Sequence, residues 1–144
     1  HSSSLRLANA LLGLGLKRGD VIAIQYPNSP EFLIAYIAIA LMGGVMCTLH
    51  MPYRAGEMAP LMNHGRTKAV ICWQGDKKYD APSTMEGLKT QVPTLEHIIV
   101  VGEPNNGQHN FKTLIETANP SPIKDPPIAS DPCILCFTSL HTQL

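Results

Sequence analysis

Two hydroxyl side chains near the carboxyl end of the chain are the residues best placed to do chemistry. Thr138 and Ser139 follow the apolar run at 133–137, which is typical of a strand that leads into a loop. In a phosphate-binding loop, hydroxyls and backbone N–H groups face the anion, and glycines let the backbone curl around it. Residues 140–144 contain neither glycine nor lysine, and Leu140 cannot adopt a positive φ without strain. Taken alone, these residues argue against a working phosphate site.

Cys133 and Cys136 have the C-x-x-C spacing of some zinc and redox sites. Zinc needs two further ligands, and a redox pair lies at a helix start, whereas this pair lies in an expected strand. We favour a packing role, and we expect these thiols, with Cys47 and Cys72, to be reduced in an intracellular protein of undetermined compartment.

His50 follows an expected strand and could act as a general base, but a loop histidine without a role is the simpler interpretation.

The composition excludes several classes of function. Lys plus Arg and Asp plus Glu number 11 each, so the formal net charge is zero, whereas nucleic-acid binding needs a basic face.

Residues 32–49 carry no charge over a length typical of a membrane helix. Gly43 and Gly44 interrupt this run, and residues 45–49 have the pattern of a strand. We therefore expect a buried helix followed by a buried strand, and no membrane span.

Residues 19–72 supply the elements that must position a loop. Three β-type runs, at 21–26, 45–49 and 68–72, alternate with two helical patterns. This order predicts right-handed βαβ units, and therefore an α/β fold with a mostly parallel sheet and helices on both faces. The helix over 30–42 is apolar nearly all round, so we expect it to be sandwiched between other elements.

The second half of the chain adds a strand, a helix and an irregular connection. Residues 97–101 predict a fourth buried strand, and residues 111–118 predict a short amphipathic helix. Residues 119–132 contain five prolines, which favours an extended connection inside the domain. A last strand, expected to be buried, covers 133–138 and leads into the hydroxyl-bearing residues.

Three segments in the same order resemble the N-terminal region of adenylate-forming enzymes, the AMP-dependent synthetases and ligases. The segments are GDVIAIQYPNSPEFLIAYIAIALMGGV at 19–45, YRAGEMAPLMNHGRTKAVIC at 53–72 and SDPCILCFTS at 130–139. The likeness is greatest to the acyl-CoA synthetase branch. It implies that residues 1–144 are a partial N-terminal, AMP-binding domain and that the family's C-terminal domain is absent from this chain.

The resemblance also implies a reaction in two halves. A carboxylic or fatty acid attacks the α-phosphate of ATP bound with Mg²⁺ to give an acyl-adenylate, and coenzyme A then displaces AMP. By position, Thr138 and Ser139 match the first two residues of the family's phosphate loop, and Thr142 matches a later threonine. Leu140 and Gln143 stand where the family has glycines.

These replacements determine the expected function of the chain. We assign no catalytic residue and no metal ligand, and we expect Thr138, Ser139 and Thr142 to be a loop remnant that binds no cofactor productively. The chain would then be the N-terminal portion of an acid–CoA ligase, inactive by itself. The alternative is a non-catalytic truncated product or pseudoenzyme that acts as an interaction module and self-associates through an uncovered sheet edge.

Overall fold

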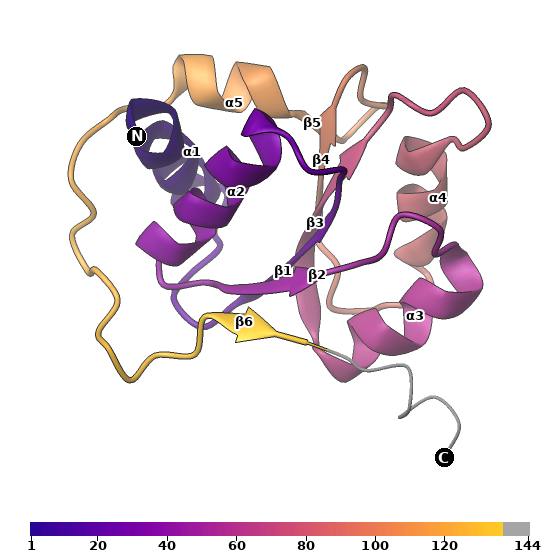
Figure 1. Cartoon of the computed structure of the whole chain (residues 1–144), viewed down its shortest axis with the longest axis horizontal. Helices are drawn as coiled ribbons and strands as arrows, with labels where there is room; N and C mark the ends of the chain where they lie inside the picture. Colours follow the sequence, from indigo (N-terminus) through magenta and orange to yellow (C-terminus); the bar gives the residue numbers. More distant parts are fainter. Residues whose placement is uncertain (137–144) are drawn as a thin grey trace.

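A parallel sheet forms the centre of the computed structural model, which describes residues 1–136. Its strand order is β5-β4-β3-β1-β2-β6, and every pairing of the described strands is parallel (Figure 1). The strands are β1 (Val21–Gln25), β2 (Val45–Thr48), β3 (Thr67–Trp73), β4 (His97–Val101), β5 (His109–Asn110) and β6 (Ile134–Leu135). The α/β fold expected from the sequence is confirmed.

The helices of the described region lie on both faces of the sheet (Figure 1). One face carries α1 (Ser2–Gly13), α2 (Pro30–Leu41) and α5 (Phe111–Thr117), and the other carries α3 (Ala55–His64) and α4 (Ala81–Leu88). The chain moves in one direction from β1 to β2, and in the opposite direction from β2 across to β3. Because both crossovers are right-handed, α2 and α3 must cover opposite faces.

Each face of the sheet has its own apolar core. Successive residues of β1 serve different cores, since Ile22 and Ile24 pack with α1 and α2 whereas Ala23 packs with α3 and α4. A strand that is buried on both faces is apolar at most positions, which explains why Val21 to Ile24 show no alternation in the sequence.

Short-range signals begin and end α2. The Ser29 hydroxyl accepts from the N–H of Phe32 at 3.2 Å, Pro30 occupies the first helical position, and Glu31 lies at the positive end of the helix dipole. After the helix, Gly43 turns the chain with φ +78°, a conformation that favours glycine. The local sequence therefore explains both ends of this helix.

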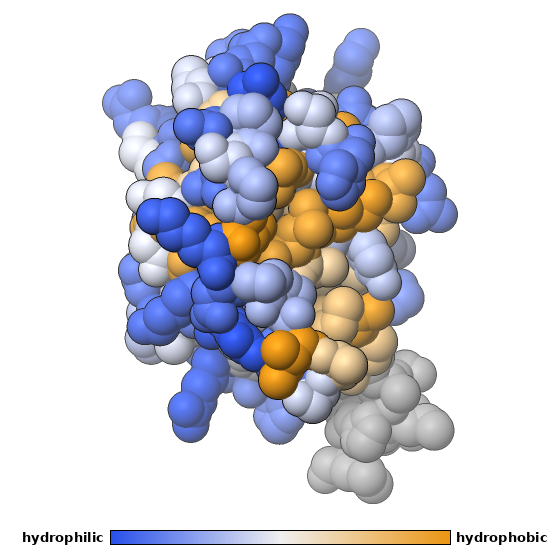
Figure 2. All heavy atoms as spheres, turned by 90° about the vertical axis from the view of Figure 1, so that its left-hand side faces the viewer, coloured by the Kyte–Doolittle hydropathy of each residue, from blue (hydrophilic) through white to orange (hydrophobic). Residues whose placement is uncertain are grey.

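The outer side of α2 differs from the expectation. We expected a sandwiched helix, but α2 buries mainly Ala35, Ala38 and Ile39, and Leu33 remains 57% exposed. Figure 2 shows apolar side chains gathered across the face on which α1, α2 and the proline-rich connection lie. The helix is apolar all round, but only one side packs against α1 and the sheet in the described region. No helix within residues 1–136 is long and apolar enough to cross a membrane.

The structure defines the start of α4 and the extent of β6. Helix α4 begins at Ala81, where the Asp80 carboxylate caps it by accepting from the N–H of Ser83 at 3.2 Å. The expected buried strand at 133–138 is, in the described region, a two-residue edge strand in which Ile134 is 45% exposed. Among residues 1–136, β2 is the one strand that pairs with β6, and the outer side of β6 carries no neighbouring strand.

The proline-rich connection is irregular, as its composition predicts, but its path is held by α1. The Arg6 guanidinium donates to the carbonyl of Ala118 at 2.7 Å. The Asn9 amide donates to the carbonyls of Asn119 and Ser121 at 2.8 and 2.7 Å. Side chains of the first helix thereby fasten a segment more than a hundred residues away in the sequence.

Candidate functional site

The carboxyl end of β1 is the position where a sheet of this topology would bind a ligand. The chain leaves β1 toward α2 on one face, whereas it leaves the neighbouring strands β2 and β3 toward the other face. Open α/β sheets bind ligands where adjacent connections diverge in this way, outside the carboxyl ends of the strands. The side chains at this point therefore decide whether a ligand can enter.

Gln25, the last residue of β1, occupies this point and is only 1% exposed. Its amide nitrogen donates to the carbonyl oxygens of His50 and Tyr53 at 3.0 and 2.9 Å. Its amide oxygen accepts from the hydroxyl of Tyr79 at 2.8 Å. One buried side chain thus ties the loop after β2 to the loop after β3, and its polar atoms are all engaged with the protein.

Arg54 completes this closure from the solvent side. Its guanidinium stacks 3.7 Å from the centre of the Tyr79 ring and donates to the carbonyls of Met51 and Tyr53, both at 2.8 Å. Burial raises the pKa of Tyr79 to about 12, although the neighbouring Arg54 opposes the shift. At neutral pH the phenol is a hydrogen-bond donor and not a base, so this cluster braces the loops and has no group poised for proton transfer.

Two shallow depressions flank the Gln25 cluster at the same edge of the sheet. Both carry more carboxylates than ammonium groups: one is lined by Asp76, Asp80 and Lys77, and the other by Glu31, Glu103, Glu116 and Lys112. A polyphosphate needs the opposite balance of charge. Neither depression therefore matches the phosphates of ATP.

The predicted site residues Thr138, Ser139 and Thr142 lie outside the described residues. The strand that precedes them, β6, runs parallel to β2 and pairs Met46 with Ile134, so its carboxyl end lies at the same edge of the sheet as the carboxyl end of β2. The structure thus describes the strand that leads to the predicted loop.

A salt bridge holds the chain just before β6. Arg18 contacts the Asp131 carboxylate at 2.7 Å and the Asp125 carboxylate at 3.3 Å. The hydrogen bond from Arg18, helped by the backbone N–H of Ile128, holds the pKa of Asp131 below its usual value. Beyond this bridge, the N–H of Met46 donates to the carbonyl of Cys133 at 2.8 Å and starts the pairing of β6 with β2.

The other sequence candidates do not converge on one site. Cys133 and Cys136 are both exposed and flank β6, so the packing role expected for them is wrong, because β6 lies at the sheet edge. His50 is exposed, and its ring lies edge-on to the Tyr53 ring at 5.1 Å. Among residues 1–136, no group of three or more His, Cys, Asp or Glu side chains could hold a metal ion.

Gln25, Tyr79 and Arg18 are functional residues that the sequence patterns did not indicate. One signal could have pointed to Gln25, since it is the only strongly polar residue in an otherwise apolar buried strand, and such a residue needs buried partners. Its partner Tyr79 is 54 residues away in the chain, and no local pattern marks the two residues as partners.

Comparisons with known proteins agree on one family. The model of the family described as AMP-binding enzyme matches residues 1–139. Acetyl-coenzyme A synthetase of Salmonella typhi is 30% identical over 157 aligned positions, which cover 99% of this chain and 24% of the relative. The 4-coumarate–CoA ligase CCL1 of Humulus lupulus is 35% identical over 89 positions, which cover 60% of this chain and 16% of the relative.

Solved structures show the same architecture. The anthranilate CoA ligase AuaEII, crystallised with anthranoyl-AMP, superposes with a TM-score of 0.85 at 23% identity. The superposition covers 96% of this chain and 26% of the ligase chain. A fatty acyl CoA synthetase of Mycobacterium tuberculosis superposes with a TM-score of 0.80 at 20% identity. These likenesses show the fold, and the chain spans about a quarter of the first relatives' length.

Proposed function

Because the chain belongs to the AMP-binding enzyme family, we propose that it is the N-terminal scaffold of an ATP-dependent acid–CoA ligase and that the 144-residue chain is inactive by itself. The family match over residues 1–139, on a chain that covers 24% of acetyl-coenzyme A synthetase, is the observation that carries this proposal. In such an enzyme a carboxylic acid would be adenylated with ATP and Mg²⁺ and then transferred to coenzyme A.

The arrangement of charge supports the inactivity of the isolated chain. At the carboxyl edge, within residues 1–136, Arg54 is engaged with Tyr79 and two carbonyls, and Lys77 lies beside two carboxylates. Transfer at the α-phosphate of ATP needs positive groups placed around the reacting phosphate. We propose that Thr138, Ser139 and Thr142 are a remnant of a phosphate loop, and we derive no catalytic step from them.

What the chain would supply is the position of that loop. Gln25 locks the loops after β2 and β3 together, and Arg18 holds Asp131 just before β6. The Gln25 contacts lie at the carboxyl edge of the sheet, from which the phosphate loop would start, whereas the Arg18 bridge lies at the opposite edge, where β6 begins. We propose that this placement of β6 and of the carboxyl edge is the contribution of the chain to a complete ligase.

A direct test is acid-dependent exchange between ATP and pyrophosphate. The purified chain is offered acetate, 4-coumarate or anthranilate with Mg·ATP, and full-length Salmonella acetyl-coenzyme A synthetase serves as the positive control with acetate. We expect no exchange above background from the 144-residue chain with any acid. Exchange that depends on one of these acids would overturn the proposed inactivity.

A pair of chimaeras separates the scaffold from the loop. In the first, residues 1–136 replace the matching segment of the Salmonella enzyme, and the relative's own sequence continues from there. In the second, the replacement extends to residue 144 and so brings in Leu140 and Gln143. If the chain is a ligase scaffold with a defective loop, the first chimaera retains acetate-dependent exchange and the second loses it. A folded first chimaera without activity would contradict the scaffold role.

A second candidate function is an interaction module without catalysis. Leu33 on α2 and Ile134 on the edge strand β6 are 57% and 45% exposed, and an unpaired strand edge favours association. Sedimentation of the purified chain at several concentrations measures this directly. A concentration-dependent oligomer that Ile134→Lys abolishes, while Ile128→Lys leaves it intact, supports self-association through β6.

The proposed compartment is intracellular. The cysteines of the described region are all free, and a reducing compartment keeps thiols in this state. Expression with a fluorescent tag followed by fractionation would locate the chain, and recovery in an oxidising compartment would contradict the proposal.

A further inference from the structure

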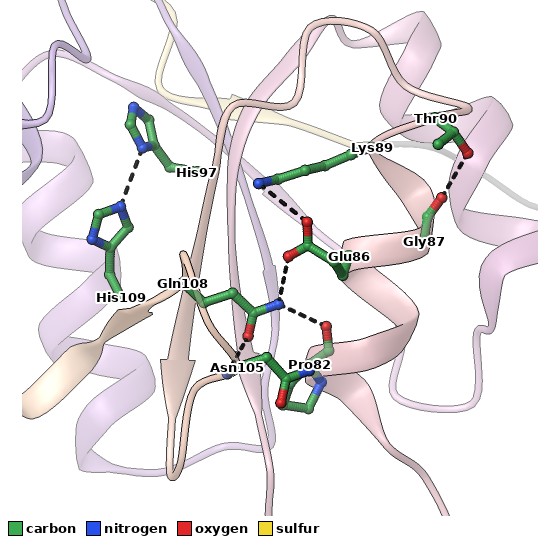
Figure 3. A network of polar contacts seen from close by, with 9 residues as sticks. All are labelled: Pro82, Glu86, Gly87, Lys89, Thr90, His97, Asn105, Gln108 and His109. Carbon is green, nitrogen blue, oxygen red and sulfur yellow. Dashed lines mark hydrogen bonds and ion pairs between the residues drawn. The ribbon is translucent and has the colours of Figure 1, made fainter.

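We propose that His97 and His109 form a binding site for a divalent transition-metal ion such as Zn²⁺, remote from the carboxyl edge of the sheet. His97 begins β4 and His109 begins β5, and the two strands are neighbours in the sheet. Figure 3 shows the two rings facing each other, apart from the polar network of α4. Imidazole nitrogen is a preferred ligand of zinc, copper and nickel.

The separation of the two ring nitrogens fits a shared metal ion. Nδ1 of His97 lies 3.3 Å from Nε2 of His109. Zinc binds imidazole nitrogen at about 2.0–2.1 Å in tetrahedral geometry, which places two ligand nitrogens about 3.3 Å apart. Without metal, one N–H can donate to the other nitrogen. A bound ion would replace that shared proton, and each ring would turn so that its lone pair points at the ion.

His109 is half-buried and lies near other charged groups. Burial, and then the neighbouring charges of His97 and Lys89, hold the pKa of His109 below its ordinary value. A neutral imidazole has a free lone pair, whereas a protonated one must release its proton before it can coordinate.

The charged groups around the pair are already compensated. The ammonium of Lys89 lies 3.4 Å from the Glu86 carboxylate, which also accepts from the amide of Gln108 at 3.0 Å. On the other side, the Lys68 ammonium lies 2.8 Å from the Glu96 carboxylate, next to His97. The pair thus lies between two neutralised ion pairs, and water would complete the coordination shell, because residues 1–136 provide no third ligand.

The backbone around His109 is fixed before any metal binds. The Gln108 amide donates to the carbonyl of Pro82 at 2.8 Å and so attaches the loop before β5 to α4 (Figure 3). The Asn110 carboxamide accepts from the N–H of Thr113 at 2.9 Å and begins α5. Ligands that are already held in place lose less entropy on binding, so two histidines can suffice for measurable affinity.

Zinc titration of the 144-residue chain tests the site. Exposed thiols are zinc ligands in general, so the titration uses the chain with Cys133 and Cys136 both changed to serine. Calorimetry should find one ion per chain, and zinc should shift the ring NMR signals of His97 and His109. His97→Gln and His109→Gln should each weaken binding about tenfold or more, and the matched change His50→Gln should leave it unchanged.

A variant that tightens binding guards against loss of fold as an explanation. Lys89→Gln removes a cation beside His109 and should increase zinc affinity several-fold, whereas Lys77→Gln, in the loop after β3, should not. Lowering the pH from about 7.5 to about 5.5 should weaken binding, because protons compete for the imidazoles. Absence of saturable binding, equal binding by the His97 and His109 variants, or no gain from Lys89→Gln would each overturn the proposal.

Discussion

The Tyr79 hydroxyl donates to the amide oxygen of Gln25 at 2.8 Å, and both residues are buried. The amide nitrogen of Gln25 donates in turn to the carbonyls of His50 and Tyr53. The position where a parallel sheet usually admits a ligand is therefore filled by the chain's own polar side chains. Stability, and not catalysis, should respond first when this cluster is changed.

Removal of the Tyr79 hydroxyl should lower the free energy of unfolding. Tyr79→Phe leaves the amide oxygen of Gln25 without its partner in a buried site, and such a loss costs about 1–3 kcal/mol. Urea unfolding followed by circular dichroism measures the change. The control is Tyr36→Phe on α2, for which we expect a change within about 0.5 kcal/mol. Equal effects of the two substitutions would show that the Gln25 contact contributes little.

Loss of the Arg18–Asp131 bridge should loosen the proline-rich connection. Asp131→Asn removes this ion pair and should speed limited proteolysis within residues 119–132. The increase should be only about two- to fivefold, because an ion pair near the surface is weak. It should be measured at low salt, because ions screen the pair. Asp125→Asn should have the smaller effect, since Asp125 is farther from Arg18 and more exposed. A larger effect at Asp125 would contradict this ranking.

The same bridge predicts a pH dependence. Because the folded pKa of Asp131 is lowered by its hydrogen bond from Arg18, its contribution is complete above the usual pKa of an aspartate. It is lost as the pH falls through the lowered value. Proteolysis of the connection by an acid-stable protease should therefore accelerate with acidification in the parent chain, and less so in the Asp131→Asn variant.

The cysteines should divide into two classes of reactivity. Burial raises the pKa of Cys47 to about 11 and that of Cys72 to about 12, whereas Cys133 and Cys136 are exposed. The thiolate is the reactive form, so an alkylating reagent at mildly alkaline pH should label the exposed pair first. Mass spectrometry of the native chain, with the urea-unfolded chain as control, checks the order. Early labelling of Cys72 would contradict its burial.

Two threonines should respond to the same substitution with opposite signs. The Thr67 hydroxyl is buried and has no hydrogen-bond partner among the described residues, so Thr67→Val should stabilise the chain by about 1 kcal/mol. The Thr94 hydroxyl donates to the Thr67 carbonyl at 2.8 Å, so Thr94→Val should destabilise by about 1 kcal/mol. Urea unfolding of both variants decides, and destabilisation by Thr67→Val would mean that its hydroxyl does have a partner.

Much of the fold follows from local patterns. The βαβ order, the buried parallel strands and the start of α2 at Ser29 and Pro30 were predictable, because each depends on residues close together in the chain. The exposure of β6 and of Leu33 was not predictable in this way. An apolar residue has the same local pattern whether or not a neighbouring element covers it.

The sequence by itself determined the class of fold and the family, because periodicity, caps and family segments are all carried by short stretches of chain, and the phosphate-loop remnant stays a prediction. Only the tertiary structure decided that Gln25 meets Tyr79, that Arg18 meets Asp131, and that His97 meets His109. These pairs depend on strand order, on register and on the face to which each crossover returns. Polar side chains distant in sequence carry no local mark of their partners, so the closed edge and the histidine pair emerge only when the sheet is assembled.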